Sequence, residues 1–244
     1  MNFVLFVLVV GVAFFIEAVV GFGASILPLA IGFLLLPANQ ILPLIQPVNW
    51  LLSGYFAMRG LRQLDRFFLL RRVLPWMGSF FIVGFLLSRV MDGVLLKLLF
   101  GVFVFVLSLL QLLKPPQKNQ APLSYRAEAL WLSIAGVIHG IYASGGPMVV
   151  YCASRRIADK TSMRATLSLI WFFFSTALVI GYISEHRVNQ TSLQQSAWLL
   201  PALFLGAKLG DLVHHKLPAE RFRSLVYVLL LIAAGFLVVS TLLK

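Results

Sequence analysis

Charged residues are scarce in this chain: they make up 11% of its 244 residues, and only 8 are acidic against 20 basic ones. An ordinary soluble domain carries about 25% charged residues, so this chain has too few to cover a water-facing surface. Hydrophobic residues make up 60%, and the mean hydropathy is +0.95. The composition excludes a cytosolic enzyme, a disordered chain and a nucleic-acid-binding module. The net charge of +12 is therefore interpreted as a signal of topology and lipid contact in an integral membrane protein.

Cysteine is almost absent. Cys152 alone excludes an internal disulfide framework and any multi-thiolate metal site within one chain. His214 and His215 are adjacent and would point apart on a helix, so no metal site is expected there. The sequence also lacks a P-loop and a His-Glu-x-x-His pair. We therefore expect that the protein does not use ATP, binds no other cofactor and is not an enzyme.

Long apolar segments dominate the chain. A helix needs about 20 apolar residues to cross a membrane, and no sustained alternation of the kind found in barrel strands occurs. The sequence therefore predicts an all-α polytopic membrane protein. Its ten apolar segments lie near residues 3–20, 22–36, 41–58, 73–88, 94–113, 127–141, 147–154, 163–183, 193–213 and 222–243.

The seventh segment, 147–154, is too short to span a membrane. It follows Ser144-Gly145-Gly146 (the second tip), so we expect either the returning limb of a re-entrant hairpin or the second half of a broken helix. Gly21-Phe22-Gly23 (the first tip) has the same place between the first two segments. Unwound backbone at membrane depth is tolerated only where it is buried in protein or lines a wet cavity. The two tips are therefore the predicted binding site; the alternative is that their glycines serve only close helix packing.

The distribution of lysine and arginine predicts the orientation. Sixteen of the 20 basic residues fall on connections that alternate to one side of the ten segments, and four fall on the other side. Cytoplasmic loops carry the Lys/Arg excess, so the richer side is predicted to be cytoplasmic and both termini to lie outside.

The two halves of the chain share a pattern. Leu74-Pro75 recurs 126 positions later as Leu200-Pro201, and Gly84 falls on Gly210 at the same offset. We expect two homologous repeats, residues 1–113 and 126–244, joined by a polar linker at 114–125; the alternative is chance coincidence. Five segments per repeat is an odd number, so the repeats would be inverted, an architecture frequent in secondary transporters.

A set of short motifs lies around the two tips and in the second half of the chain: Gly21-Phe22-Gly23, Pro28, His139-Gly140, Ser144-Gly145-Gly146-Pro147, Tyr151 and Arg164-Ala165-Thr166. With these motifs the sequence resembles the TauE/SafE sulfite-exporter family, also called the four-toluene-sulfonate uptake permeases. The resemblance covers essentially the whole chain. It implies an inner-membrane transporter of a small sulfur-containing or carboxylated anion.

An anion within the membrane needs hydrogen-bond donors with little desolvation cost, and backbone N–H groups at helix N-termini meet that need. The second tip fits because its glycines allow close approach and Pro147 can start the returning helix. At the first tip, the Ser25 hydroxyl is a further candidate donor.

Polar residues within apolar segments are the other candidates for substrate binding. Gln46 and Asn49 flank Pro47, where we expect an unwound point. Arg164 could hold an anion with its guanidinium, or it could bond phospholipid at the membrane edge. Thr166 could bind substrate or satisfy a helix carbonyl.

Two titratable residues are candidates for proton coupling. Glu17 is the only acid deep within an apolar segment, and His139 precedes the second tip by five residues. Each could carry a proton, or could merely tie helices together. The predicted function is alternating-access transport of a sulfite-like or sulfonate-like anion; a passive anion channel is the main alternative, and a membrane enzyme or assembly factor is a weaker one.

Overall fold

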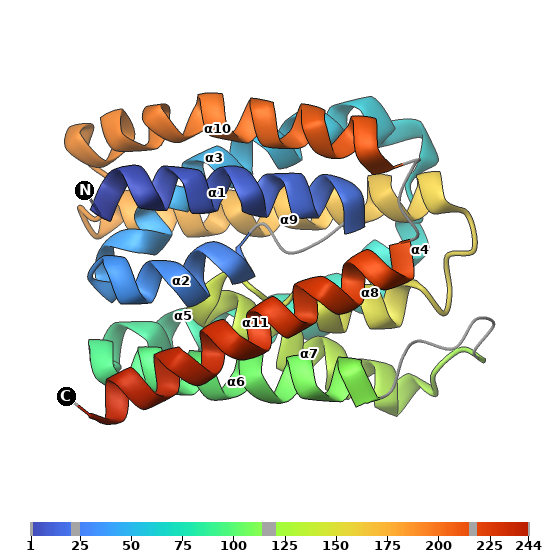
Figure 1. The fold of residues 1–244 in the computed structure, drawn as a ribbon. Helices are drawn as coiled ribbons and strands as arrows, with labels where there is room; N and C mark the ends of the chain where they lie inside the picture. The colour runs from blue at the N-terminus through green and yellow to red at the C-terminus, as the bar shows by residue number, and fades with distance from the viewer. Residues whose placement is uncertain (1, 21–24, 114–120, 215–218, 244) are drawn as a thin grey trace. The chain divides into compact units, whose positions relative to one another are not determined.

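The computed structural model describes residues 2–20, 25–113, 121–214 and 219–243, and these form helices with no strand among them. The prediction of an all-helical chain is confirmed. The helices are α1 (Asn2–Val20), α2 (Ile26–Leu35), α3 (Ala38–Gly60), η1 (Leu61–Gln63), α4 (Arg66–Phe68), η2 (Leu69–Gly78), α5 (Ser79–Val90), α6 (Gly93–Leu113), α7 (Tyr125–Tyr142), α8 (Gly146–Ala153), α9 (Lys160–Ser184), α10 (Gln190–His214) and α11 (Ala219–Leu242) (Figure 1).

The fourth predicted segment begins earlier than the sequence suggested. Helices α4, η2 and α5 follow one another without a break from residue 66, whereas the segment was expected to start at 73. The cause is local, because the Asp65 carboxylate caps the helix by accepting a bond from the Phe68 amide at 2.8 Å. The stretch η2 is a π-helix that contains Pro75. Its wide turn accommodates a residue that lacks the amide hydrogen.

The prediction of an unwound point at Pro47 is wrong. Helix α3 runs from Ala38 to Gly60 without interruption. Membrane helices tolerate an internal proline when neighbouring groups satisfy the freed carbonyl, so the proline alone was not sufficient reason to expect a break.

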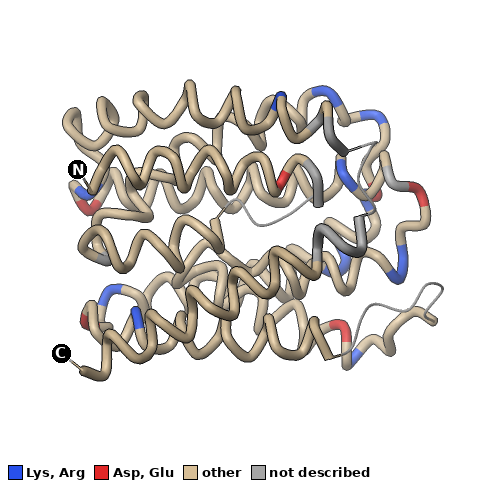
Figure 2. The backbone as a smooth tube through the Cα atoms, in the orientation of Figure 1, with Lys and Arg blue, Asp and Glu red and all other residues tan. Residues whose placement is uncertain are grey.

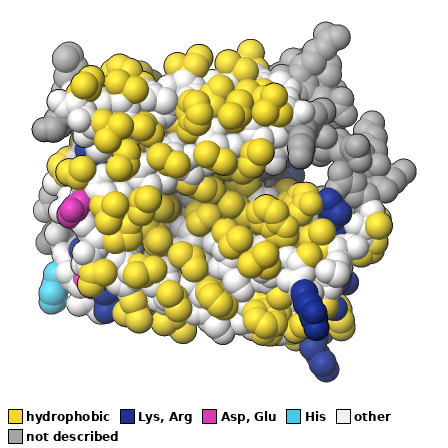
Figure 3. Space-filling model, turned by 90° about the horizontal axis from the view of Figure 1, so that it is seen from below, with side chains coloured by type: hydrophobic (Ala, Val, Ile, Leu, Met, Phe, Trp, Pro, Cys, Tyr) yellow, Lys and Arg dark blue, Asp and Glu magenta, His cyan; other side chains and the backbone are white. Residues whose placement is uncertain are grey.

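Apolar side chains cover the outside of the helices. Four described helical stretches are long and apolar enough to cross a membrane: Arg66–Val90, Gly93–Leu113, Thr161–Ser184 and Ser224–Leu242. Figure 2 shows that charged residues gather near helix ends, and hydrophobic side chains cover most of the face drawn in Figure 3. A soluble protein would not expose so much apolar surface. The chain is a multi-pass membrane protein.

The helices form two compact units. Unit 1 comprises residues 1–45, 91–117 and 190–244. In it α1 lies beside α10 (Figure 1), and a Cβ on Gly206 would come within 2.2 Å of the Gly11 carbonyl oxygen. Helix α6 packs on α11, where Gly101 lies against Val238. Small residues therefore let the backbones of these helices approach closely.

Unit 2 comprises residues 46–90 and 118–189. In it α5 packs on α7, again through glycines: a Cβ on Gly84 would come within 2.2 Å of the Val137 carbonyl oxygen. A Cβ on Gly140 would come within 2.3 Å of the Phe81 carbonyl oxygen. Helix α3 contacts α9 through a stack of Trp50 on Phe172, with ring centroids 5.8 Å apart.

Within each unit, a segment from one half of the sequence packs on a segment from the other half. In unit 1 the first segment of the first half packs on the fourth segment of the second half (α1 on α10). In unit 2 the fourth segment of the first half packs on the first segment of the second half (α5 on α7). A duplicated chain would produce this reciprocal pattern. The division into repeats at 1–113 and 126–244 stays a prediction that the packing supports.

The basic connections of unit 2 meet at one end of that unit. Glu128, buried at the start of α7, forms ion pairs with Arg72 of η2 at 3.4 Å and with Arg156 after α8. The Ser162 hydroxyl also donates to the Gln63 carbonyl at 2.6 Å. Three connections predicted to share a side thus contact one another. The assignment of that side to the cytoplasm stays a prediction.

Candidate functional site

The second tip is a tight reversal between α7 and α8. Helix α7 ends at Tyr142, and Ala143 adopts a left-handed conformation with φ of 54°. Such a conformation costs a non-glycine residue roughly 1–2 kcal/mol, and strain of this kind is concentrated at functional sites. After the tip, α8 packs back along α7. Of the two arrangements considered for segment seven, the structure shows the returning limb of a hairpin.

Hydrogen bonds within the hairpin hold the tip in place. The Gly145 amide donates to Nδ1 of His139 at 3.4 Å, and the Ser144 hydroxyl donates to the Tyr142 carbonyl at 2.8 Å. A Cβ on Gly145 would come within 2.3 Å of the Ala135 carbonyl oxygen. Only glycine fits at this position, because the tip lies so close to the backbone of α7.

An aromatic wall surrounds His139. Its side chain is 4% exposed, and its ring stacks on Trp171 with centroids 5.5 Å apart and planes at 16°. Phe174 and Phe81 lie at 5.6 Å and 6.2 Å. Nε2 of His139 has no hydrogen-bond partner among the described residues. A buried donor or acceptor without a partner is costly, so this atom is suited to a ligand.

The N-terminus of α8 adds backbone donors beside the histidine. Pro147 stands in its first turn, and the first amides of a helix have no intrahelical acceptor. The positive end of the helix dipole favours an anion there. A Cβ built on Gly146 would lie 3.8 Å from the Trp171 ring, so the aromatic wall extends to this end of α8.

Two of the predicted site residues lie elsewhere in unit 2. The Thr166 hydroxyl is fully buried and accepts a hydrogen bond from the Asp65 amide at 2.9 Å. Arg164 is exposed, with its guanidinium carbon 4.7 Å from the centroid of the Phe56 ring. At a rise of about 1.5 Å per residue, Arg164 precedes Trp171 by roughly 10 Å along α9. The structure therefore does not bring this arginine to the second tip.

Gln46 and Asn49 are buried on α3, with 1% and 8% exposure. Oε1 of Gln46 has no hydrogen-bond partner within the described part of the chain. Trp50, one turn further along α3 from Gln46, stacks on Phe172, the neighbour of Trp171 in α9. A part for Gln46 and Asn49 in substrate binding stays a prediction.

The remaining candidates belong to unit 1. Glu17 is half-buried in the last turn of α1, and Ser25 precedes α2 with its carbonyl accepting a bond from the Leu29 amide at 3.1 Å. Gly21, Phe22 and Gly23, the first tip, lie outside the described residues. Their part in a site stays a prediction.

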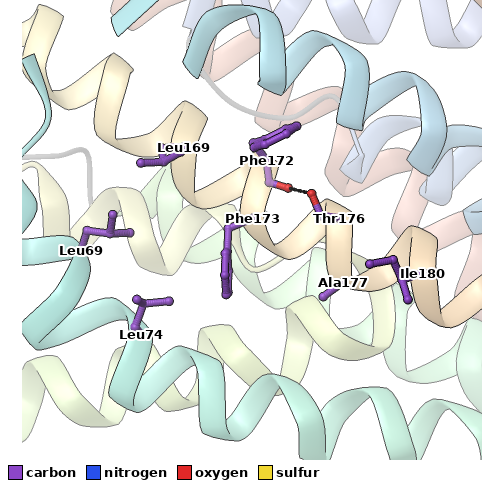
Figure 4. Close-up of a pocket in the computed structure, with 8 residues that line it drawn as sticks. All are labelled: Leu69, Leu74, Leu169, Phe172, Phe173, Thr176, Ala177 and Ile180. Atoms are coloured by element: carbon purple, nitrogen blue, oxygen red, sulfur yellow. Dashed lines mark hydrogen bonds between the residues drawn. The ribbon is translucent and has the colours of Figure 1, made fainter. Parts of the chain in front are cut away.

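Unit 2 also contains an apolar cavity of about 480 Å³ between η2 and α9 (Figure 4). Among the described residues that line it, the one polar side chain is Thr176, whose hydroxyl donates to the Phe172 carbonyl at 2.7 Å and accepts from the Trp50 indole at 2.8 Å. This described lining offers an anion no polar side chain that lacks a partner, so the cavity is not the candidate site. It is lined by Leu69, Leu74, Leu169, Phe172, Phe173, Thr176, Ala177 and Ile180.

The sequence did not reveal the aromatic wall. Trp171, Phe174 and Phe81 were not among the candidate site residues, because an apolar pattern does not distinguish them from the other aromatic residues. The one signal for Trp171 was its place in the middle of an apolar segment, away from the membrane edges where tryptophan is enriched. Among the described residues, no group of three metal-ligating side chains occurs.

The all-helical fold, the apolar exterior and a buried helical hairpin with a glycine tip are typical of a polytopic membrane transporter. Comparison with known proteins agrees, since the family model described as sulfite exporter TauE/SafE matches residues 5–237. This chain belongs to the TauE/SafE sulfite exporter family. The family description names a transporter and not an enzyme, as expected from the sequence.

A curated relative is similar over part of its length. The chain is 27% identical over 104 residues to the "Probable inner membrane transporter protein TsaS" of Comamonas testosteroni. The match covers 42% of this chain and 43% of the relative, less than half of either protein. No solved structure matches the chain.

Proposed function

We propose that this protein is a secondary transporter that moves a small sulfur-containing anion, such as sulfite or a sulfonate, across the cytoplasmic membrane by alternating access. The observation that carries the proposal is the second tip, where Gly145, Gly146 and the N-terminus of α8 lie beside buried His139. Family membership supports a sulfur oxyanion as cargo, and the relative's name supports the inner membrane.

The second tip binds the anion through the backbone amides at the start of α8 and through Nε2 of His139. Backbone donors suit a transporter because they bind a negative charge without introducing a permanent buried cation. The Ser144 hydroxyl bonds the Tyr142 carbonyl, so its contribution is to the shape of the tip. By the predicted repeat, we propose the same role for the first tip with Ser25.

Two side chains are candidates for coupling transport to a proton. Glu17 lies in unit 1 and His139 in unit 2. A carboxyl or imidazole that gains a proton when the anion binds would let a proton gradient drive transport. If Glu17 carries the coupling proton, Glu17→Gln abolishes proton-driven uptake in a folded protein; unchanged pH dependence would remove Glu17 from the mechanism and leave His139.

Counterflow in proteoliposomes tests the proposal and separates it from a passive channel. Vesicles are loaded with unlabelled 4-toluenesulfonate, sulfite, thiosulfate, sulfoacetate or a carboxylate, and uptake of the same labelled anion is followed. A carrier exchanges internal for external substrate and gives a transient accumulation of label. A channel gives uptake that internal substrate does not accelerate. Transport restricted to cations would overturn the anion assignment, and chemical conversion of the substrate would indicate an enzyme.

A further inference from the structure

A hydrogen bond joins the Gly145 amide to the His139 imidazole at the second tip. The amide donates to Nδ1 at 3.4 Å. A nitrogen that accepts a hydrogen bond carries a lone pair and no proton, so His139 is neutral in this arrangement and its single ring proton is on Nε2. The same hydrogen bond occupies an amide immediately before α8, where an anion would be bound.

Addition of a proton to His139 would change both groups at once. A proton that binds to Nδ1 forms an N–H bond there and removes the lone pair, so the hydrogen bond from Gly145 is lost. The Gly145 amide keeps its own hydrogen and becomes free to donate to another acceptor. The tip then offers an additional backbone donor next to a positive imidazolium.

Within the described residues of unit 2, that imidazolium would have no opposite charge beside it unless an anion accompanied it. The rings around His139 are uncharged: Phe81 comes from α5, and Trp171 and Phe174 come from α9. The nearest charged residue earlier on its own helix, Glu128, lies 11 residues away, or roughly 16 Å along the axis. Glu128 is already paired with two arginines.

The hairpin itself adds no compensating charge near the histidine. Its buried titratable side chains Tyr142 and Cys152 are of types that are ordinarily uncharged at neutral pH. Burial disfavours a lone charge, whereas stacking on Trp171 favours a cation. A bound anion supplies the opposite charge that the site lacks. Proton and anion should therefore bind together more tightly than either binds alone.

We infer that the second tip takes up one proton on His139 for each monoanion that it binds, and that the Gly145 amide released by that proton is part of the anion site. Because the two binding events share one free-energy cycle, the proton strengthens anion binding and the anion strengthens proton binding by the same factor. The inference rests on the proposed function and specifies how its transport is coupled to protons.

Calorimetry of 4-toluenesulfonate binding to the purified full-length protein tests the inference. This sulfonate stays a monoanion across the working pH range, so any proton exchanged belongs to the protein. Measurements at one pH in buffers of different ionisation enthalpy give the number of protons taken up per ligand. We expect about one proton per bound sulfonate and, while His139 is neutral in the free protein, roughly tenfold tighter binding for each unit fall in pH between about pH 8 and 5.

Variants identify the proton carrier. His139→Gln cannot take up a proton and also loses Nε2, so it is expected to bind the sulfonate more weakly than the wild-type protein does at low pH. Its remaining binding is expected to show no proton uptake and no dependence on pH. His186→Gln is the matched control, since His186 is exposed in the turn after α9; it is expected to retain full proton uptake. Trp171→Leu removes the stack and is expected to weaken the pH dependence.

The possible outcomes separate the inference from the proposed function. Binding by the wild-type protein without proton uptake overturns the inference and leaves anion transport standing, and this measurement needs no variant to fold. Proton uptake that persists in His139→Gln, or that is lost only in Glu17→Gln, also overturns it. If neither 4-toluenesulfonate nor sulfite binds or is transported at any pH tested, the proposed function fails and the inference fails with it.

Discussion

Gly145→Ala should displace the second tip while leaving the helices of unit 2 in place. The added Cβ would lie 2.3 Å from the Ala135 carbonyl oxygen. An ordinary contact requires at least 3.4 Å, so the gap must widen by about 1.1 Å. The obstacle is backbone within α7 and cannot rotate away. We therefore expect the tip to move and the Gly145 amide to lose its alignment.

The expected losses follow from the two effects of this shift. Overpacking a close backbone contact costs about 1–3 kcal/mol of unfolding free energy. Losing one hydrogen bond to a charged group costs roughly 1.5–3 kcal/mol of binding free energy, which is about 10- to 150-fold in affinity for a sulfonate. Thermal unfolding and 4-toluenesulfonate binding, measured on the same preparation, check the two values separately.

Gly78→Ala is the control, because beyond the neighbouring turns of η2 no atom of the described residues lies within 4 Å of a Cβ at Gly78. It should bind and transport as the wild-type protein does. Gly146→Ala should lose less than Gly145→Ala, since its Cβ meets only the Trp171 ring at 3.8 Å. If Gly145→Ala binds and transports the sulfonate as well as Gly78→Ala, the tip is not the binding site and the reasoning is refuted.

Two further predictions concern stability. Glu128→Gln leaves Arg72 and Arg156 without their buried partner, so it should lower the free energy of unfolding by about 3–5 kcal/mol in a reversible assay. Glu185→Gln, at the more exposed pair with Arg89, should lower it by less than about 1 kcal/mol. Equal losses in the two variants would contradict this account. Gly84→Ala and Gly210→Ala lie at corresponding positions of the predicted repeats. Each should lower thermal stability, because the added Cβ atoms would meet backbone oxygens at 2.2 Å and 2.6 Å. A loss of thermal stability in only one variant would argue against equivalent packing in the two halves.

The sequence was sufficient to locate the helices and the second tip. Membrane thickness sets the length of an apolar helix, so 147–154 stood out as too short, and the glycines and Pro147 indicated where the chain turns. The expected start of the fourth segment was wrong because the Asp65 cap and the π-helical turns around Pro75 extend that helix. Neither feature changes the apolar pattern from which the segment was read.

The surroundings of the tip could not be read from the chain. His139 was recognised because a histidine is rare in an apolar segment, but its partners depend on which helices pack against α7. Trp171 reaches it from α9 and Phe81 from α5, and one apolar aromatic residue looks like another in a sequence so rich in them. The sequence likewise did not identify the partner of Thr166, whose hydroxyl accepts a hydrogen bond from the Asp65 amide. A polar residue in an apolar segment shows that a partner is needed without identifying it.

The location of a bound anion tests the central claim most directly. A crystal structure of the protein with 4-bromobenzenesulfonate would place the ligand through the anomalous scattering of its bromine. The account predicts that the sulfonate oxygens lie within hydrogen-bond distance of the amides at the start of α8 and of Nε2 of His139. A sulfonate bound in the apolar cavity between η2 and α9, with the second tip unchanged and without ligand, would contradict it.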